Sequence, residues 1–167
     1  MFLRTALLAG LAMAIGAIPV TASGQVSPNP ADRSAAIERT RSVLEAYWKE
    51  HDPRYVAEDA VFVMMPSGEE IRGREAITKH INGFYHGALE AKAEVVNSVF
   101  GENKGLLEAM VVGKHTGVFA GIPATGRDVR VPIGVAYELE DGLIKKARIY
   151  LMVNVLLQQI GPAPATP

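Results

Sequence analysis

The second half of the sequence is its most constraining feature, because it consists of four long segments that alternate like β-strands. The segments cover residues 89–100, 105–119, 127–138 and 143–153. Short polar turns divide them, at GENKG after the first segment and at EDG before the last, and EDG is typical of a hairpin. Strands joined by such tight turns pair as antiparallel neighbours. The sequence therefore predicts an antiparallel meander over this half of the chain.

A helix is predicted near the start of the domain. Asp32 or Ser34 can cap it, and an apolar stripe that includes Tyr47 and Trp48 marks its buried face. It should end at the HDP triplet of residues 51–53, because the residue before a proline is driven out of the helical region.

A short apolar strand at residues 60–65 and a second amphipathic helix at residues 74–86 follow. Two helices before a meander favour an α+β fold with the helices on one face of a curved sheet.

The N-terminal residues 1–22 are predicted to be a secretory signal peptide. They contain Arg4, an apolar run over residues 6–18 that is short for a membrane span, and a Val-x-Ala site ending at Ala22. An uncleaved anchor helix is the alternative. Cleavage predicts a periplasmic or secreted protein with no stable membrane insertion.

The remaining chain divides simply. Residues 23–33 are polar and contain two prolines, which favours a flexible lead-in. Residues 34–161 form one domain, and residues 162–167 are predicted to be a disordered tail.

Composition excludes several classes of function. The sequence has no cysteine, so neither disulfides nor thiol catalysis can be expected. Residues 1–22 hold one arginine and no acid, so 16 of the 17 basic side chains remain against 18 acidic ones. We expect no nucleic-acid partner, because there is no basic excess. The four histidines form no ligand pattern with carboxylates, so no metal and no cofactor are predicted.

His115 stands out because it lies in an apolar strand between two glycines. It shares a face with Leu107 and Val111, whereas Glu108 and Lys114 take the opposite face, so its ring should point inward. An inward histidine can be a structural residue bonded to a backbone carbonyl. It can also be a general base, because its ordinary pKa lies near neutrality. Spacing alone leaves both interpretations open.

The last strand presents a second row of polar side chains, formed by Arg148, Tyr150, Met152 and Asn154 in one phase. In a sheet with one wet face this row would meet solvent, and in a sheet curled around a cavity it would line the pocket. The sequence alone does not determine whether this row faces solvent or lines a pocket.

The stretches GKHTGVFAGIPATGRDV and YELEDGLIKKARIYLMVNVLLQQIG resemble the SnoaL-like polyketide cyclase or ester cyclase family. That family belongs to the nuclear-transport-factor-2-like superfamily, and the resemblance implies a cone-shaped α+β fold. A curled, mostly antiparallel sheet would pack against the N-terminal helices and enclose an apolar pocket. The resemblance, together with the open sheet face that four long strands imply, also predicts a homodimer.

The family's proton-handling aspartate corresponds to Met152, and Lys114 stands where the family usually has threonine. Met65 occupies the position where a ketosteroid-isomerase-like site would need a carboxylate. A thioether can neither accept nor donate a proton usefully. The sequence thus departs from the family at its acid.

Two functions remain open on these grounds. One is a metal-free cyclase, isomerase or lyase acting on a carbonyl-bearing apolar substrate, with His115 handling the proton and Arg148 and Tyr150 polarising an oxygen. The other is a non-catalytic protein that binds a hydrophobic small molecule, which the two methionines favour. The predicted ligand-binding residues in either case are Trp48, Met65, His80, Met152 and Asn154.

Overall fold

The computed structural model describes residues 29–161. The predicted signal peptide, the lead-in up to residue 28 and the predicted tail at residues 162–167 lie outside this range. The first half of the fold comprises α1 (Pro30–Glu50), a 3-10 turn η1 (Pro53–Tyr55), β1 (Val56–Met64), β2 (Glu69–Arg72), α2 (Arg74–Asn82) and a π-helical turn η2 (Gly83–Ala88). The second half comprises β3 (Leu89–Gly101), β4 (Lys104–His115), β5 (Asp128–Glu140), β6 (Leu143–Leu151) and α3 (Val153–Ile160).

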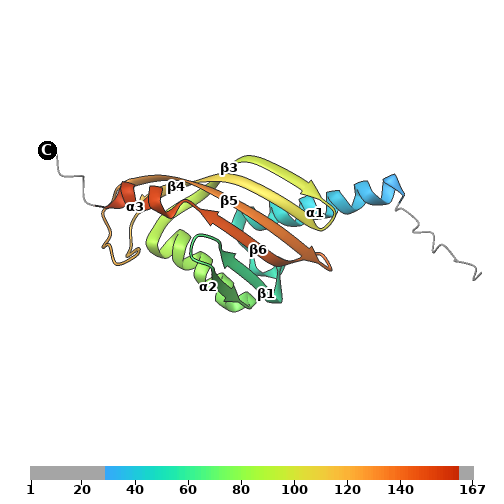
Figure 1. The fold of residues 1–167 in the computed structure, drawn as a ribbon, viewed down its shortest axis with the longest axis horizontal. Coiled ribbons are helices and arrows are strands. Elements are labelled where there is room, and N and C mark those ends of the chain that lie inside the picture. Colours follow the sequence, from blue (N-terminus) through green and yellow to red (C-terminus); the bar gives the residue numbers. More distant parts are fainter. Residues whose placement is uncertain (1–28, 162–167) are drawn as a thin grey trace, which may run out of the picture.

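The six strands form one sheet in the order β2-β1-β6-β5-β4-β3. All neighbouring strands are antiparallel except β1 and β6, which run parallel. Figure 1 shows α1 and α2 on the same side of this curved sheet, and α3 at the end where β6 finishes. The predicted α+β fold, with a curled and mostly antiparallel sheet against the first two helices, is therefore confirmed.

Two boundaries differ from the sequence-based expectation. The helix α1 begins at Pro30, with the side chain of Asn29 accepting a hydrogen bond from the Ala31 amide at 3.2 Å, so neither Asp32 nor Ser34 is its cap. The strand β4 stops at His115 instead of residue 119. There the amides of Thr116 and Gly117 donate to the carbonyl oxygen of Ala88 in η2, at 3.1 and 3.0 Å, instead of continuing the sheet.

Two elements were not predicted from the residue pattern. The strand β2 has only four residues and begins with two glutamates, so its apolar content is too low to be recognised. The helix α3 begins directly after β6, and its apolar residues prolong the strand-like run of the sequence.

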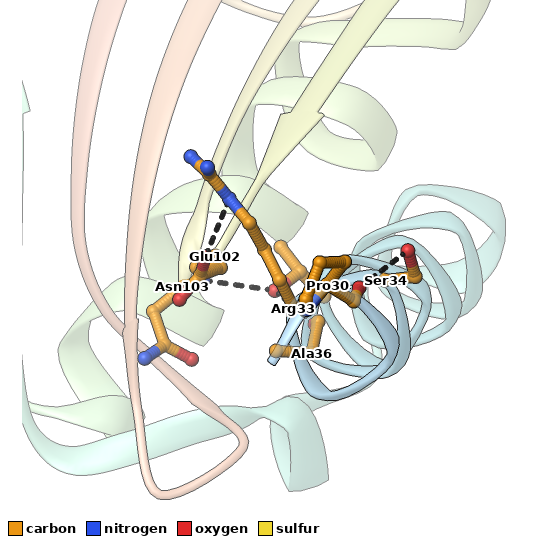
Figure 2. Close-up of polar contacts among 7 residues, drawn as sticks. Pro30, Arg33, Ser34, Ala36, Glu102 and Asn103 are labelled. Atoms are coloured by element: carbon orange, nitrogen blue, oxygen red, sulfur yellow. Dashed lines mark hydrogen bonds and ion pairs between the residues drawn. The ribbon is translucent and has the colours of Figure 1, made fainter. Parts of the chain in front are cut away.

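The helix α1 is fastened to the turn between β3 and β4 near its N-terminus (Figure 2). Arg33 Nε lies 2.8 Å from Glu102 Oε1, and the amide of Asn103 donates to the hydroxyl of Thr40 at 3.0 Å. Thr40 is 2% exposed, so this hydrogen bond is shielded from water. These contacts fix the orientation of α1. Its last turns, which include Trp48, therefore point toward the interior.

The core lies between the two N-terminal helices and the inner face of the sheet. Leu44, Phe62, Ile77 and Val131 are at most 2% exposed. Within residues 29–161, no helix combines the length and the apolarity that a membrane crossing needs.

Candidate ligand-binding site

A cavity lies inside the fold, walled by α1, α2, η2 and the inner face of the sheet. Its aromatic walls are Tyr47, Trp48, Phe62, Phe84, Tyr85 and Tyr137. Aliphatic side chains and one thioether complete most of the lining: Met64, Ile81, Ala93, Leu107, Ile133, Val135, Ile149 and Leu151. Two histidines, His51 and His80, are the remaining lining residues. This confirms that the sheet and helices enclose an apolar pocket.

The aromatic side chains form a connected series along the cavity wall. The ring centroids of Trp48 and Tyr137 are 6.0 Å apart, and those of Tyr137 and Tyr47 are 6.3 Å apart. Tyr47 meets His51 edge to face at 5.4 Å, and His51 meets Tyr85 at 4.7 Å. Such arrangements are favoured over face-to-face stacking by the ring quadrupoles. The wall is therefore held by mutual contacts between α1, η2 and β5.

The cavity lining contains no carboxylate, lysine, arginine, amide or aliphatic hydroxyl among the residues that the structure describes. Its polar atoms belong to three tyrosines, one tryptophan and two histidines. The indole N–H of Trp48 is buried and makes no well-formed hydrogen bond in the described range. A charged ligand group would find no counter-ion here, so the site suits an uncharged molecule.

Burial keeps the three tyrosines protonated. It raises the pKa of Tyr85 to about 12 and that of Tyr47 well above its ordinary value. The pKa of Tyr137 is raised by burial first and then by Tyr47 and Tyr85. The hydroxyls therefore act as neutral hydrogen-bonding groups and not as phenolates.

His51 is the C-terminal cap of α1 and has a left-handed backbone, with φ 52° and ψ 35°. This conformation is uncommon for a residue other than glycine, although histidine adopts it more readily than bulky residues do. Burial, and then the neighbouring His86, lower the pKa of His51 to about 4. The imidazole is therefore neutral at ordinary pH and offers one nitrogen as a hydrogen-bond acceptor.

The accessible space within the cavity is about 50 Å³. A cavity of roughly 150 Å³ is needed to hold benzene, so only waters fit without movement. Two surface depressions adjoin the cavity. One shares Trp48, His51 and Tyr85 with it, and the other shares His80 and Phe84. Ala93 is shared with the first depression as well, and Met64 and Leu151 with the second. These side chains separate the interior from the surface, so their movement would both enlarge and open the cavity.

Phe84 connects the second depression to the loop after β4. Its ring lies 6.0 Å from that of Phe119, which sits in a tight turn with Ile122. This loop and α3 lie at the same end of the sheet (Figure 1). A Cβ atom at Gly117 would overlap the carbonyl oxygen of Gly87, so the glycine permits the loop to approach η2 this closely.

Two of the predicted ligand-binding residues, Trp48 and His80, line the cavity. Trp48 reaches it from the last turns of α1 and His80 from the last turn of α2. The sequence placed both on helices, with His80 at the pocket mouth, and the structure agrees with that position.

Arg148 and Tyr150 lie on the other face of the sheet. The cavity is lined instead by Ile149 and Leu151, the opposite phase of β6. Arg148 pairs with Glu138 of β5 at 2.5 Å and thereby lowers the pKa of that carboxyl, and Tyr150 is 48% exposed. The interpretation of this row as a pocket lining was therefore wrong, because alternation defines two faces but not which one is concave.

Met65, Met152 and Asn154 line a separate depression at the end of β6, together with Tyr150. Met65 and Met152 are 38% and 45% exposed. The position of the family's aspartate thus lies outside the cavity, beside the start of α3, and not on its concave wall as expected.

His115 is fully buried, as its strand phase predicts, but it is not among the residues that line the cavity. Its Nδ1 lies 3.0 Å from the hydroxyl of Thr125 and accepts a hydrogen bond from the Thr125 amide at 3.3 Å. Its Nε2 is buried and has no partner within residues 29–161. These contacts favour the structural interpretation of His115, whose catalytic role stays a prediction.

Four of the cavity residues that carry polar atoms were not proposed as site residues: His51, Tyr47, Tyr85 and Tyr137. Tyr47 and Tyr85 were expected on buried helix faces, and His51 was treated only as a helix terminator. An aromatic pair followed by a helix-ending histidine, YWKEH, was the available signal. No group of three or more metal-ligating side chains occurs in the part of the chain that the structure describes.

Comparison with known proteins defines the class. The sequence profile of the SnoaL-like polyketide cyclase family matches residues 35–160. The chain therefore belongs to this family. Among curated protein sequences, none matches the chain closely enough to indicate a relationship.

Solved structures share the fold. A protein from Jannaschia sp. CCS1 that carries the name SnoaL-like polyketide cyclase superposes with a TM-score of 0.72 at 18% identity, covering 80% of this chain and 99% of that one. A polyketide cyclase by name from Xanthomonas campestris pv. campestris gives a TM-score of 0.68 at 18% identity, covering 75% and 99%. A phenazine biosynthesis-related protein from Pseudomonas aeruginosa gives 0.67 at 18% identity, covering 86% and 94%. The fold is thus the nuclear-transport-factor-2-like fold that the sequence resemblance implied.

Proposed function

We propose that the protein binds an uncharged, apolar small molecule in the cavity between α1, α2 and the sheet. One observation carries this proposal: the lining is aromatic and aliphatic, and it holds no charged side chain and no carboxylate. Family membership supports a small-molecule role. Of the two functions left open by the sequence, the cavity favours ligand binding over a cyclase reaction that depends on a carboxylate.

The ligand must displace side chains to enter, because the unliganded cavity is too small for an aromatic ring. Phe84 is suited to this movement, since it belongs to a π-helical turn that contains Gly83 and Gly87. Movement of Phe84 would join the cavity to the depression beneath the β4–β5 loop.

The sequence contains a single tryptophan, Trp48, and it lines the cavity. Its fluorescence therefore reports occupancy directly. Titration with N-phenyl-1-naphthylamine, which is uncharged and apolar, should change the Trp48 emission to saturation with one site per chain. Absence of any saturable change, with the protein shown to be folded by circular dichroism, would contradict the proposal.

Export and dimerisation complete the proposed function. Export rests on the signal-like residues 1–22, which lie outside the described range. Dimerisation rests on the outer sheet face, where Leu106 is 40% exposed and Tyr150 is 48% exposed. The residues of β5 next to them are small: Gly134 pairs with Tyr150, and Ala136 pairs with Leu106. The same face carries Glu108 and the Arg148–Glu138 pair, and a partly exposed sheet face of this kind suits a second copy of the chain.

A further inference from the structure

The ring of His51 occupies the boundary between the cavity and the surface depression beside α1. It is one of the lining residues that the two share, together with Trp48, Tyr85 and Ala93. Its position is held by three contacts: the edge of Tyr47 at 5.4 Å, the ring of Tyr85 at 4.7 Å, and its own amide bonded to the carbonyl of Tyr47 at 2.7 Å. The imidazole is therefore fixed where a ligand in the cavity would meet it.

The left-handed backbone at His51 supports a functional role. A helix of this kind commonly ends with glycine in that conformation, because glycine has no Cβ to clash. Here the strain of a side chain is retained at a position that directs an imidazole toward the cavity, which His80 also lines from α2. Strained residues of this kind tend to occur at ligand sites, where the surrounding structure maintains them.

His51 differs from Trp48 and the tyrosines of the lining in its capacity to accept a hydrogen bond. The indole of Trp48 only donates, and a phenol donates more readily than it accepts. An imidazole nitrogen is the strongest neutral acceptor in this set. The lining has two imidazoles, His51 and His80, and His51 is the one in ring contact with Tyr47 and Tyr85. Because burial holds the pKa of His51 near 4, no proton competes for that nitrogen at neutral pH.

We propose that His51 is the hydrogen-bond acceptor of the site and selects flat apolar ligands that carry a phenolic or enolic hydroxyl. The hydroxyl would donate to the free imidazole nitrogen while the ring system lies among the tyrosines and Trp48. This assignment rests on the proposed function, because it requires that an apolar molecule enters the cavity. His51 would thus let the site select among ligands, which Met152, at the position of the family's acid, cannot do.

Two probes of nearly equal shape test the inference: 2-naphthol, which has a hydroxyl, and 2-methoxynaphthalene, which cannot donate. Both are titrated against Trp48 emission at pH 7.5. We expect 2-naphthol to bind about 5-fold more tightly, which corresponds to one net hydrogen bond of about 1 kcal/mol. This comparison is made on the unmodified protein and needs no variant.

The variant His51→Gly removes the imidazole and leaves no side-chain acceptor, and glycine suits the left-handed backbone. In this variant the two probes should bind with equal affinity. The matched control is His86→Asn, because His86 neighbours His51 but is exposed and does not line the cavity. The control should keep the full preference for 2-naphthol.

The outcomes separate this inference from the proposed function. If neither probe binds the unmodified protein, the proposed function itself fails. If both probes bind the unmodified protein equally well, or if His51→Gly keeps the preference for 2-naphthol, the cavity binds apolar molecules but the role of His51 is refuted.

Discussion

The Nδ1 atom of His115 lies 3.0 Å from the hydroxyl of Thr125, and this contact ties the end of β4 to the loop that leads into β5. The amides and carbonyls around it reinforce the connection. His115 receives the Gly126 amide on its carbonyl oxygen at 2.9 Å and donates its own amide to Arg127 at 2.9 Å. Arg127 in turn donates to the carbonyl oxygens of Gln159 and Gly161 at the end of α3. A buried histidine thus organises one end of the fold.

His115→Ala should therefore destabilise the protein by about 1–3 kcal/mol, from a lost buried hydrogen bond and the cavity left behind. Thr125→Val should cost less, about 0.5–1.5 kcal/mol, because the amide of Thr125 can still donate to the ring. Urea denaturation measures both values. Affinity for N-phenyl-1-naphthylamine should stay unchanged in His115→Ala. A variant of unchanged stability that no longer binds the probe would instead establish His115 as a pocket residue.

His51 predicts a pH dependence of stability. Its pKa is about 4 in the folded protein and about 6.5 in an unfolded chain. Between these values the unfolded chain binds a proton that the folded protein does not. The free energy of unfolding should therefore fall as pH falls from about 6.5 to 4, by up to about 3 kcal/mol, and this contribution is fully present above pH 6.5.

The control is His51→Asn, measured by urea denaturation at pH 7.5, 6, 5 and 4. The groups around His51 are Tyr47, Tyr85 and His86, and the adjoining depression also contains Glu45, Lys49, Glu50 and Lys92. They are present in both proteins, so the difference in stability between the two isolates His51. A difference that does not change with pH would show that His51 titrates normally.

The strands and helices of the domain could be largely predicted, because their alternation and stripes follow directly from burial. β3, β5 and β6 lie close to the predicted ranges. The end of β4 was missed, since the apolar residues after His115 continue the pattern although their amides bond to η2. A run of apolar residues indicates that a segment is buried, but it does not indicate which groups accept the hydrogen bonds of its backbone amides.

The face of β6 shows why the site was harder to predict. Arg148 and Tyr150 could have lined the cavity, and only the pairing of Arg148 with Glu138 on the outer face decides the matter. That pairing depends on the register between β5 and β6, which the sequence does not state. His51 was missed for a similar reason: its place in the cavity comes from the direction of α1, set by contacts between Thr40 and Asn103 far from it in sequence.

Dimerisation should be visible in sedimentation at micromolar concentration as a species of twice the chain mass. Ala136→Glu places a second carboxylate beside the Arg148–Glu138 pair on the outer sheet face and should yield a monomer, because burying an additional, bulky charge at an interface is costly. Val96→Glu is the control, since Val96 is 66% exposed on the edge strand β3. A monomer in the unmodified protein would exclude this association.

Export should leave a mature chain that begins at Ser23. Cell fractionation followed by N-terminal sequencing measures both the compartment and the cleavage site. Changing Ala22 to a bulky residue should block cleavage, because the processing site requires small side chains. A cytoplasmic protein that keeps Met1 would refute the prediction.

The central claim is that the ligand binds in the cavity. A substitution that fills the cavity with a large side chain tests this most directly. Ala93 lines the cavity from β3. In Ala93→Phe the new ring should fill the space that the ligand would occupy. Val99→Phe adds the same side chain on the same strand at a position that is 57% exposed and outside the cavity. In a Trp48 titration with N-phenyl-1-naphthylamine, Ala93→Phe should weaken binding about 10-fold or more, about 1.4 kcal/mol, while Val99→Phe binds like the unmodified protein. Equal affinity in all three folded proteins would show that the probe binds elsewhere and would contradict the cavity as the binding site.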